Sequence, residues 1–313
     1  MKKRVFVTGA TGYLGSAVVA RLVGAGHDVH GLTRSTDRAK SLEALGVHAV
    51  IGDLGESQRW IGVLQNCDSA IHVAFDSGSS AKAGGPATTS QQDFNALEAF
   101  RIAALDGRVR KVIYTSGAWV HGHGGGRVVD ESAPLAPLEI AKWRAVHEEM
   151  ALDLSAHDVD VVVMRPGMVY GERRGILGGW FAEAHDAGTV TYPGDGSQHW
   201  AAVHRDDVAE AYALALEHGK GGGSYLLTDE SHDTVREMAE AVASATRTKA
   251  RSWSAEDVVR TLGPFGKALL NDLSVTSAKA RRELGWVPGH ASFVAEVATL
   301  RDEWNRGREA LAA

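Results

Sequence analysis

Short apolar runs alternate with segments of helical periodicity along the first half of the chain. Residues 5–7 form an apolar run that predicts a buried strand, and residues 14–23 carry apolar side chains at helical spacing. Further strands are predicted at residues 28–33, 49–51, 68–74 and 111–115, and a further helix at residues 92–105. Because strands and helices alternate in this way, we expect an α/β fold with a doubly wound parallel sheet.

Three glycines stand at the turn between the first strand and the first helix, with the spacing G-x-x-G-x-x-G. Such glycines allow a tight turn, a close approach of the backbone to a pyrophosphate, and close packing of helix on strand. The free N–H groups of the helix N-terminus suit the phosphates. The pattern therefore predicts a dinucleotide site. Its residues are Gly9, Thr11, Gly12, Tyr13, Leu14 and Gly15.

The residues that follow the second and third strands indicate which cofactor binds. An acidic residue after the second strand accepts a hydrogen bond from the ribose 2′-hydroxyl of NAD, whereas a basic residue pairs with the 2′-phosphate of NADP. This chain has Arg34 there, with Arg38 nearby, and so favours NADP(H). The alternative is a solvated arginine in a loop. After the third strand, Asp53 and the adjoining Leu54 are expected to face the adenine.

Composition and charge argue against several classes of protein. The 313 residues are 44% hydrophobic and 23% charged, which is typical of a soluble globular protein. The net charge of −6 and the lack of a basic run argue against nucleic-acid binding. No apolar stretch approaches the roughly 20 residues that span a bilayer, so no membrane association is expected.

The single cysteine, Cys67, excludes an intrachain disulfide and fits a reducing compartment, so a cytoplasmic location is predicted. The histidines show no metal-ligand spacing, and no metal site is expected.

The second half of the chain is less regular. Residues 1–170 are expected to form mainly the dinucleotide-binding domain, and residues 171–313 mainly a smaller lobe, with later segments returning to the sheet. A strand is predicted at residues 224–227 and helices at residues 234–245 and 277–284. Aromatic residues gather in this half; a core role explains most of them, and an apolar or ring-shaped substrate stays open. These residues are Trp180, Phe181, Tyr192 and Trp200.

The stretch before the predicted helix at residues 92–105 is rich in glycine and alanine. Residues 76–92 also contain several serines and threonines and one proline. Loops of this length and composition are uncommon in compact domains unless they serve a function. We therefore expect a mobile loop over the active site.

Six short motifs occur in order along nearly the whole chain. They are TGATGYLG at 8–15, GDL at 52–54, HVA at 72–74, RPGMVYG at 165–171, VHRDDVA at 203–209, and SAKA with LGWVP at 277–288. In these motifs the sequence resembles the extended short-chain dehydrogenase/reductase family, in its epimerase/dehydratase-like branch. The resemblance implies a Rossmann-type fold with a smaller C-terminal substrate lobe, a nicotinamide cofactor, and a homodimer as a candidate assembly. It also implies that Ala74, Pro166 and Val169 lie near the cofactor.

The chain departs from that family's pattern at the catalytic residues. The family uses a serine after the fifth strand and a Tyr-x-x-x-Lys pair one helical turn apart, in which the lysine holds the ribose and the tyrosine exchanges the proton. Here Gly117 stands where the usual second serine would be, Ile140 takes the tyrosine position and Arg144 the lysine position. A register shifted by two residues would place Leu138 and Lys142 there instead. Neither register contains a Tyr-x-x-x-Lys pair.

Other residues are candidates to rebuild the site. The segments TSGAWV at 115–120 and WRAVHE at 143–148 resemble an atypical branch of the same family, which suggests a rebuilt site rather than a decayed one. Arg144 could hold ribose and phosphate groups as a fixed cation, but its pKa above about 12 makes it a poor proton donor. Ser116 keeps a hydroxyl near the substrate carbonyl.

Two residues are candidates for the proton transfer. His121 follows the C-terminal end of a strand, where an imidazole suits acid–base work; the alternative is a surface histidine in a glycine-rich loop. Tyr170 could also donate a proton, although in its motif it more often packs near the cofactor. Together with Ser116, Trp119 and Arg144, these residues are expected to surround the nicotinamide, with Ile140 leaving an apolar hole.

The sequence leaves two main classes of function open. The first is an NADP(H)-dependent oxidoreductase that acts on a small organic carbonyl, imine or enone with a non-standard proton donor. The second is a catalytically silent NADP(H)-binding sensor or regulator. A weaker option is a non-redox enzyme of the epimerase or dehydratase type.

Overall fold

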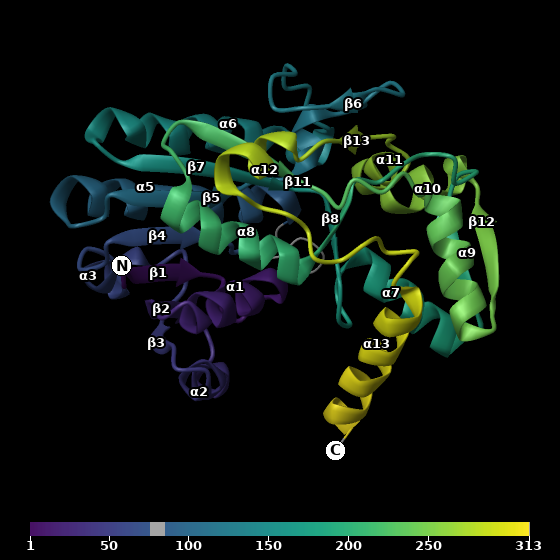
Figure 1. Ribbon diagram of the computed structural model, residues 1–313, viewed down its shortest axis with the longest axis horizontal. Helices are drawn as coiled ribbons and strands as arrows, with labels where there is room; N and C mark the ends of the chain where they lie inside the picture. Colours follow the sequence, from purple (N-terminus) through teal and green to yellow (C-terminus); the bar gives the residue numbers. More distant parts are fainter. Residues whose placement is uncertain (76–84, 313) are drawn as a thin grey trace.

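The architecture is a parallel sheet with helices on both faces and a smaller lobe beside it (Figure 1). The computed structural model describes residues 1–75 and 85–312, with side chains described except at 85–88 and 310–312. The central sheet has seven strands in the order β11-β7-β5-β4-β1-β2-β3. Every neighbouring pair runs parallel. The predicted α/β fold with a doubly wound parallel sheet is thus confirmed.

The elements have the following bounds. The strands of the central sheet are β1 Arg4–Thr8, β2 Asp28–Thr33, β3 His48–Ile51, β4 Ser69–His72, β5 Lys111–Thr115, β7 Asp160–Pro166 and β11 Gly223–Leu227. Three shorter parallel pairs are β6 Val128–Val129 with β13 Ser274–Val275, β8 Met168–Tyr170 with β10 Ala202–His204, and β9 Thr189–Pro193 with β12 Lys249–Trp253. The helices are α1 Tyr13–Gly24, α2 Thr36–Ala44, α3 Ile61–Leu64, α5 Gly85–Asp106, α6 Lys142–Asp153, α7 Gly175–Ala187, α8 Arg205–His218, α9 Val235–Thr246, α10 Ala255–Leu262, α11 Pro264–Leu269, α12 Ala278–Leu284 and α13 Val297–Ala312. The 3₁₀ turns are η1 Ser57–Arg59, η2 Ala118–His121, η3 Glu139–Ala141 and η4 Leu154–His157.

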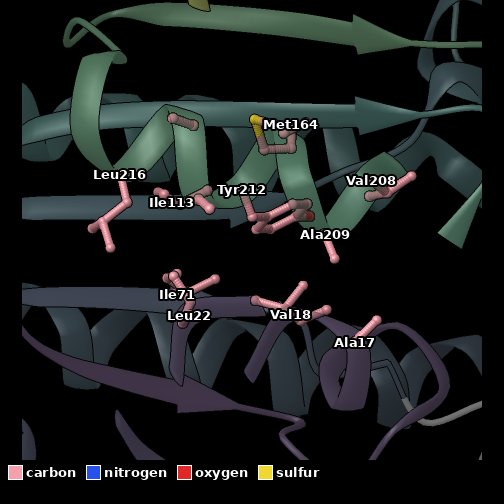
Figure 2. Close-up of a cluster of buried hydrophobic side chains, with 14 of the residues drawn as sticks. Ala17, Val18, Leu22, Ile71, Ile113, Met164, Val208, Ala209, Tyr212 and Leu216 are labelled. Carbon is pink, nitrogen blue, oxygen red and sulfur yellow. The ribbon is translucent and has the colours of Figure 1, made fainter. Parts of the chain in front are cut away.

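The helices α1 and α8 cover one face of the sheet. Figure 2 shows Val18 and Leu22 of α1 and Tyr212 of α8 facing the strand residues Ile71 and Ile113. These side chains are all buried. Because both faces of the sheet are covered, its central strands β1, β5 and β7 carry runs of apolar residues instead of an alternation with polar ones.

The opposite face packs against α3, α5 and the C-terminal part of α6. Phe6 points to this face, whereas its neighbours Val5 and Val7 belong to the cluster under α1 and α8. The Trp60 ring stacks on Phe6 with the ring centroids 5.4 Å apart. The Trp60 indole N–H donates to the backbone oxygen of Asp53, which fixes the chain after β3.

The smaller lobe has its own apolar core, built from α7, α9, α13 and the short strands β8, β9 and β10. Trp180 and Trp200 stack with their ring centroids 5.7 Å apart, and Phe181 is buried beside them. Tyr192 packs against the same core while only partly buried. The aromatic residues of the second half therefore serve mainly as core, as the sequence indicated. The later elements α8, β11 and α12 return to the central sheet.

The glycine-rich loop predicted before α5 is shorter than expected. The predicted loop at residues 76–92 is wrong from Gly85 onward, because α5 already begins there and runs to Asp106. A proline as the second residue of a helix costs little, since its missing N–H has no partner there anyway. Residues 76–84 lie outside the described part of the chain. Among the described residues, no helix is both long and apolar enough to cross a membrane.

Candidate active site

The carboxyl ends of β1, β4, β5 and β7 meet along one edge of the sheet. These strands are neighbours and parallel, so Thr8, His72, Thr115 and Pro166 lie at the same edge. Open parallel sheets bind their ligands in the crevice outside this edge. The candidate site is therefore built from the loops that leave these strands.

The glycine turn after β1 leaves no room for side chains. Gly9 has a φ of +70°, and a Cβ there would lie 2.6 Å from the Cα of Ala74. A Cβ on Gly15 would lie only 2.0 Å from the Gly9 oxygen. Gly12 precedes α1, and no side chain caps the N-terminus of that helix. The free helix end and close backbone fit a pyrophosphate, so the residues present suit a dinucleotide.

The other predicted cofactor residues lie around this turn. Tyr13 donates from its hydroxyl to the Gly171 oxygen at 2.7 Å and thereby ties the turn to the segment after β8. At the end of β2, Arg34 is 64% exposed and its Nη1 lies 3.9 Å from an Asp53 carboxylate oxygen. The remaining predicted residues are half-buried, except for buried Pro166; they are Thr11, Leu14, Leu54, Ala74, Pro166 and Val169.

The side chain of Arg144 is held at the end of β5. Its Nη1 donates to the backbone oxygen of Thr115 at 2.9 Å. The guanidinium carbon lies 4.5 Å from the centre of the Trp143 ring and 5.0 Å from that of Phe75. Cation–π contacts with two rings and one hydrogen bond restrict a side chain that is otherwise long and mobile. Ile140 lies in η3, two residues before α6 begins, whereas Arg144 lies in α6. The two positions are therefore not on one continuous α-helical turn, as the family pattern would require.

Ser116 presents a buried hydroxyl at the same strand end. Its backbone N–H donates to the Met164 oxygen at 2.8 Å, which fixes its position between β5 and β7. The residue is 5% exposed, and among the described residues its Oγ has no hydrogen-bond partner. A buried polar atom without a partner costs stability, so such an atom is explained best by a ligand. A Cβ on the next residue, Gly117, would meet only the Pro166 oxygen, at 3.8 Å.

His121 is buried beside an ion pair. Its Nε2 lies 3.1 Å from Arg165 Nη1, and Arg165 also donates to both carboxylate oxygens of Glu148. Its Nδ1 is buried without a partner among the described residues. Burial, and then the charge of Arg165, lower the pKa of His121 to about 4. The ring is therefore neutral at pH 7 and serves as a hydrogen-bonding group, not as an imidazolium.

A buried polar network that sequence reasoning missed lies behind Arg144. Asp93 of α5 is 3% exposed and accepts from the Tyr114 hydroxyl at 2.9 Å. Its carboxylate also lies 2.9 Å from His72 Nε2 and 2.7 Å from His147 Nδ1. Burial alone would raise the pKa of Asp93, but the two histidines hold that pKa below its usual range. The His147 ring in turn packs edge-on against Trp143, 5.2 Å away. No sequence signal joins these residues, because their partners lie 21 and 54 positions apart.

Tyr170 lies away from the other candidates. It is fully buried in the core of the lobe, and its hydroxyl donates to Asp229 at 3.1 Å. Burial and the Asp229 charge raise the pKa of Tyr170 well above its usual range. Trp119 faces Phe265 of α11, with ring centroids 6.4 Å apart. The structure therefore gathers Ser116 and Arg144 at the end of β5 but turns Trp119 and Tyr170 towards the lobe.

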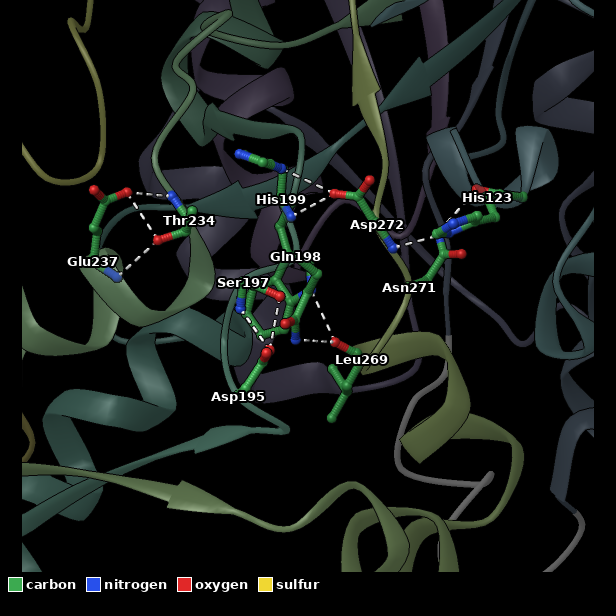
Figure 3. A network of polar contacts seen from close by, with 12 residues as sticks. His123, Asp195, Ser197, Gln198, His199, Thr234, Glu237, Leu269, Asn271 and Asp272 are labelled. Atoms are coloured by element: carbon green, nitrogen blue, oxygen red, sulfur yellow. Dashed lines mark hydrogen bonds and ion pairs between the residues drawn. The ribbon is translucent and has the colours of Figure 1, made fainter. Parts of the chain in front are cut away.

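A cavity of about 970 Å³ is lined by the loop after η2 and by segments of the smaller lobe. Its lining includes His123 and His199 but none of Ser116, Arg144 and Tyr170. Figure 3 shows part of its wall, where Asp272 accepts from the His199 backbone N–H at 2.8 Å and lies 2.9 Å from its Nδ1. The loop after η2 connects the two regions, because His123 lines the cavity and His121 ends η2 two residues earlier.

Three comparisons relate the chain to known proteins. Residues 5–227 match the model of the family described as "NAD dependent epimerase/dehydratase family". The chain is 30% identical over 300 residues to an uncharacterized protein of Schizosaccharomyces pombe, covering 95% of this chain and 98% of that protein. It is 27% identical to the 4-hydroxy-2-methyl-3-oxo-4-farnesyl-3,4-dihydroquinoline-1-oxide ketoreductase of Stigmatella aurantiaca, with 98% of both chains covered.

The fold is similar to a solved structure of a sugar-nucleotide enzyme. The dTDP-glucose 4,6-dehydratase of Streptomyces venezuelae, solved with NAD bound, superposes with a TM-score of 0.83. The superposition covers 98% of each chain at 23% sequence identity. At this identity the likeness concerns the fold and its Rossmann-type sheet.

Proposed function

Because the chain belongs to the NAD-dependent epimerase/dehydratase family, within the extended short-chain dehydrogenases/reductases, we propose that it is an NADP(H)-dependent reductase of a small organic substrate. The substrate class is a carbonyl, imine or enone. The family consists of NAD(P)-dependent oxidoreductases and epimerases, and this chain is an enzyme of that family. The full-length similarity to a ketoreductase agrees with reduction, and the choice of reduction over epimerisation rests on the residues of the site.

The observation that carries the proposal is the group at the end of β5. The clamped guanidinium of Arg144 and the unpartnered hydroxyl of Ser116 lie at neighbouring points of one strand end, because Arg144 bonds to Thr115. A fixed cation and a buried donor at the ligand-binding edge of the sheet suit a polarised double bond.

Each residue then has a defined part. When bound, the cofactor supplies the hydride for reduction. Arg144 would hold the ribose and phosphate oxygens, because its charge persists at every physiological pH. Ser116 would donate its hydroxyl hydrogen bond to the substrate oxygen or nitrogen. His121, neutral at pH 7, would act through an N–H hydrogen bond near the substrate.

The missing tyrosine bears on the substrate class. Ile140 offers no proton where the family places a phenol. Reduction of a simple ketone gains the most from a positioned acid, whose contribution is about 10²–10⁴-fold. Imines and conjugated enones need less help, because they carry or spread the developing charge more readily. The cavity that His123 helps to line would take the part of the substrate remote from the reacting atoms. The cytoplasmic location and the homodimer stay predictions.

A panel of carbonyls, imines and enones tests the proposal. The loss of NADPH absorbance is followed with each compound, and NADPH binding is measured separately by fluorescence. We expect NADPH consumption with at least one of the three classes. Binding of NADPH with no consumption across the panel would instead identify a silent sensor. Substrate turnover without net NADPH change would identify a non-redox epimerase or dehydratase.

A further inference from the structure

Three side chains with metal-binding groups lie together at the amino-terminal edge of the sheet. Asp28 and His30 are two residues apart on β2, so both point to the same face of the strand. His48 opens β3 and is the register partner of His30 on the neighbouring parallel strand. One carboxylate and two imidazoles therefore share one face of two adjacent strands. This edge is opposite to the one that carries the candidate active site.

The distances between their ligand atoms suit a single ion. Asp28 Oδ1 lies 3.0 Å from His48 Nε2, and Asp28 Oδ2 lies 3.7 Å from His30 Nε2. One ligand atom from each of the three residues can be chosen so that all three lie within 4.8 Å of one another. Two ligands at about 2.0–2.1 Å from one tetrahedral zinc ion are about 3.4 Å apart, so only small side-chain rotations are needed.

The buried ring nitrogen of His30 has, among the described residues, no hydrogen bond that would account for its position. Its Nε2 is buried and makes no hydrogen bond within the described part of the chain. Its ring stacks on that of His48, with centroids 4.8 Å apart.

We propose that Asp28, His30 and His48 form a binding site for a divalent transition metal ion such as zinc. Imidazole and carboxylate ligands select zinc, nickel and copper, whereas magnesium and calcium prefer oxygen ligands alone. Three protein ligands leave a fourth position for water. The ion would clip the edge strand β3 to β2, far from the reacting atoms, so its effect is on stability and not on the chemical step.

Arg4 competes for the same carboxylate. Its Nε donates to Asp28 Oδ2 at 3.2 Å, and the side chain is 45% exposed, so it can move into solvent. Arg4 and the metal ion are both cations attracted to the same carboxylate. Removing the Arg4 charge should therefore strengthen metal binding, whereas a merely structural ion pair would give no such gain.

Calorimetric titration of the tag-free, full-length protein with zinc chloride tests the site. We expect one zinc ion per chain with a Kd below about 10⁻⁴ M, and a higher melting temperature in zinc. His48→Gln should weaken binding at least tenfold; this residue is 65% exposed, so the variant should fold as the wild type does. Arg4→Gln should bind zinc more tightly.

The matched control is His185→Gln. His185 is exposed, and its Nδ1 lies 2.8 Å from a carboxylate oxygen of Asp186. It does not belong to the candidate metal group found among the described residues. This variant should bind zinc as the wild type does. No saturable binding in the wild type, equal binding by His48→Gln and wild type, or binding by Arg4→Gln that is no tighter than that of the wild type would each overturn the proposal.

Discussion

At the scale of one residue, the hydroxyl of Ser116 is proposed to serve turnover while lowering the stability of the fold. The group is buried and has no partner among the described residues, so it costs folding free energy without returning a hydrogen bond. Ser116→Ala should therefore leave the free energy of unfolding within about 1 kcal/mol of the wild type, or raise it. Turnover should fall at least tenfold, as for the loss of one positioned donor. Urea denaturation and NADPH consumption measure the two effects. A variant that loses stability but keeps its turnover would show that Ser116 serves the fold alone.

Arg34 is the residue on which the proposed preference for NADP(H) depends. Removing its guanidinium takes a charge-assisted partner from the 2′-phosphate, worth about 1.5–3 kcal/mol, or about ten- to hundredfold in affinity. Arg34→Ala should weaken NADPH binding by this factor and leave NADH binding nearly unchanged, as fluorescence titrations would measure. Arg59→Ala is the control, because that arginine is similarly exposed and pairs with Glu56 outside the predicted cofactor residues. Equal affinity of the wild type for the two cofactors would refute the preference.

At the scale of elements, Asp93 joins α5 to α6 and to two strands. Removing the charge of a buried carboxylate that balances several donors typically costs about 3–5 kcal/mol. Asp93→Asn should lower the free energy of unfolding by this amount. Tyr114→Phe removes only one of the three hydrogen bonds and should cost about 1 kcal/mol. Urea denaturation of both variants measures the difference. Similar costs for the two variants would mean that the network contributes no more than one ordinary hydrogen bond.

The elements also show what the sequence could and could not predict. The first strand, the glycine turn and α1 were predictable because apolar periodicity and glycine spacing are local signals. The start of α5 was not, because glycine, proline and threonine are typical of loops as well as of helix N-termini. The Asp93 network and the group of Asp28, His30 and His48 depend on strand register and helix packing. Such contacts join residues far apart in the chain, so no spacing rule detects them.

At the scale of the whole molecule, buried histidines make stability depend on pH. The pKa of His121 is about 4 in the folded protein against about 6.5 in the unfolded chain. As the pH falls below 6.5, the unfolded chain takes up a proton first, so this stability is lost between about pH 6.5 and pH 4. We expect His121 to contribute up to about 2 kcal/mol to the loss between pH 7 and pH 5.

Urea denaturation at pH 7 and pH 5 measures this loss. His121→Gln should reduce the difference in the free energy of unfolding between pH 7 and pH 5, whatever its effect at pH 7. His218→Gln should leave the difference unchanged, because that ring is exposed at the end of α8. If His121→Gln loses as much unfolding free energy between pH 7 and pH 5 as the wild type does, His121 is not buried in a neutral state.

The central claim is that the absence of a Tyr-x-x-x-Lys pair redirects the chemistry of the proposed active site. The triple variant Gly117→Ser, Ile140→Tyr, Arg144→Lys installs the family's residues in the register that places Ile140 at the tyrosine position, and Gly117 has room for a side chain. The decisive measurement is the turnover of a simple ketone by this variant and by the wild type, with NADPH binding checked for both. We predict at least tenfold faster ketone reduction by the triple variant, part of the ~10²–10⁴ that a positioned acid supplies. Ketone reduction by the wild type at the rate of the triple variant would contradict the account.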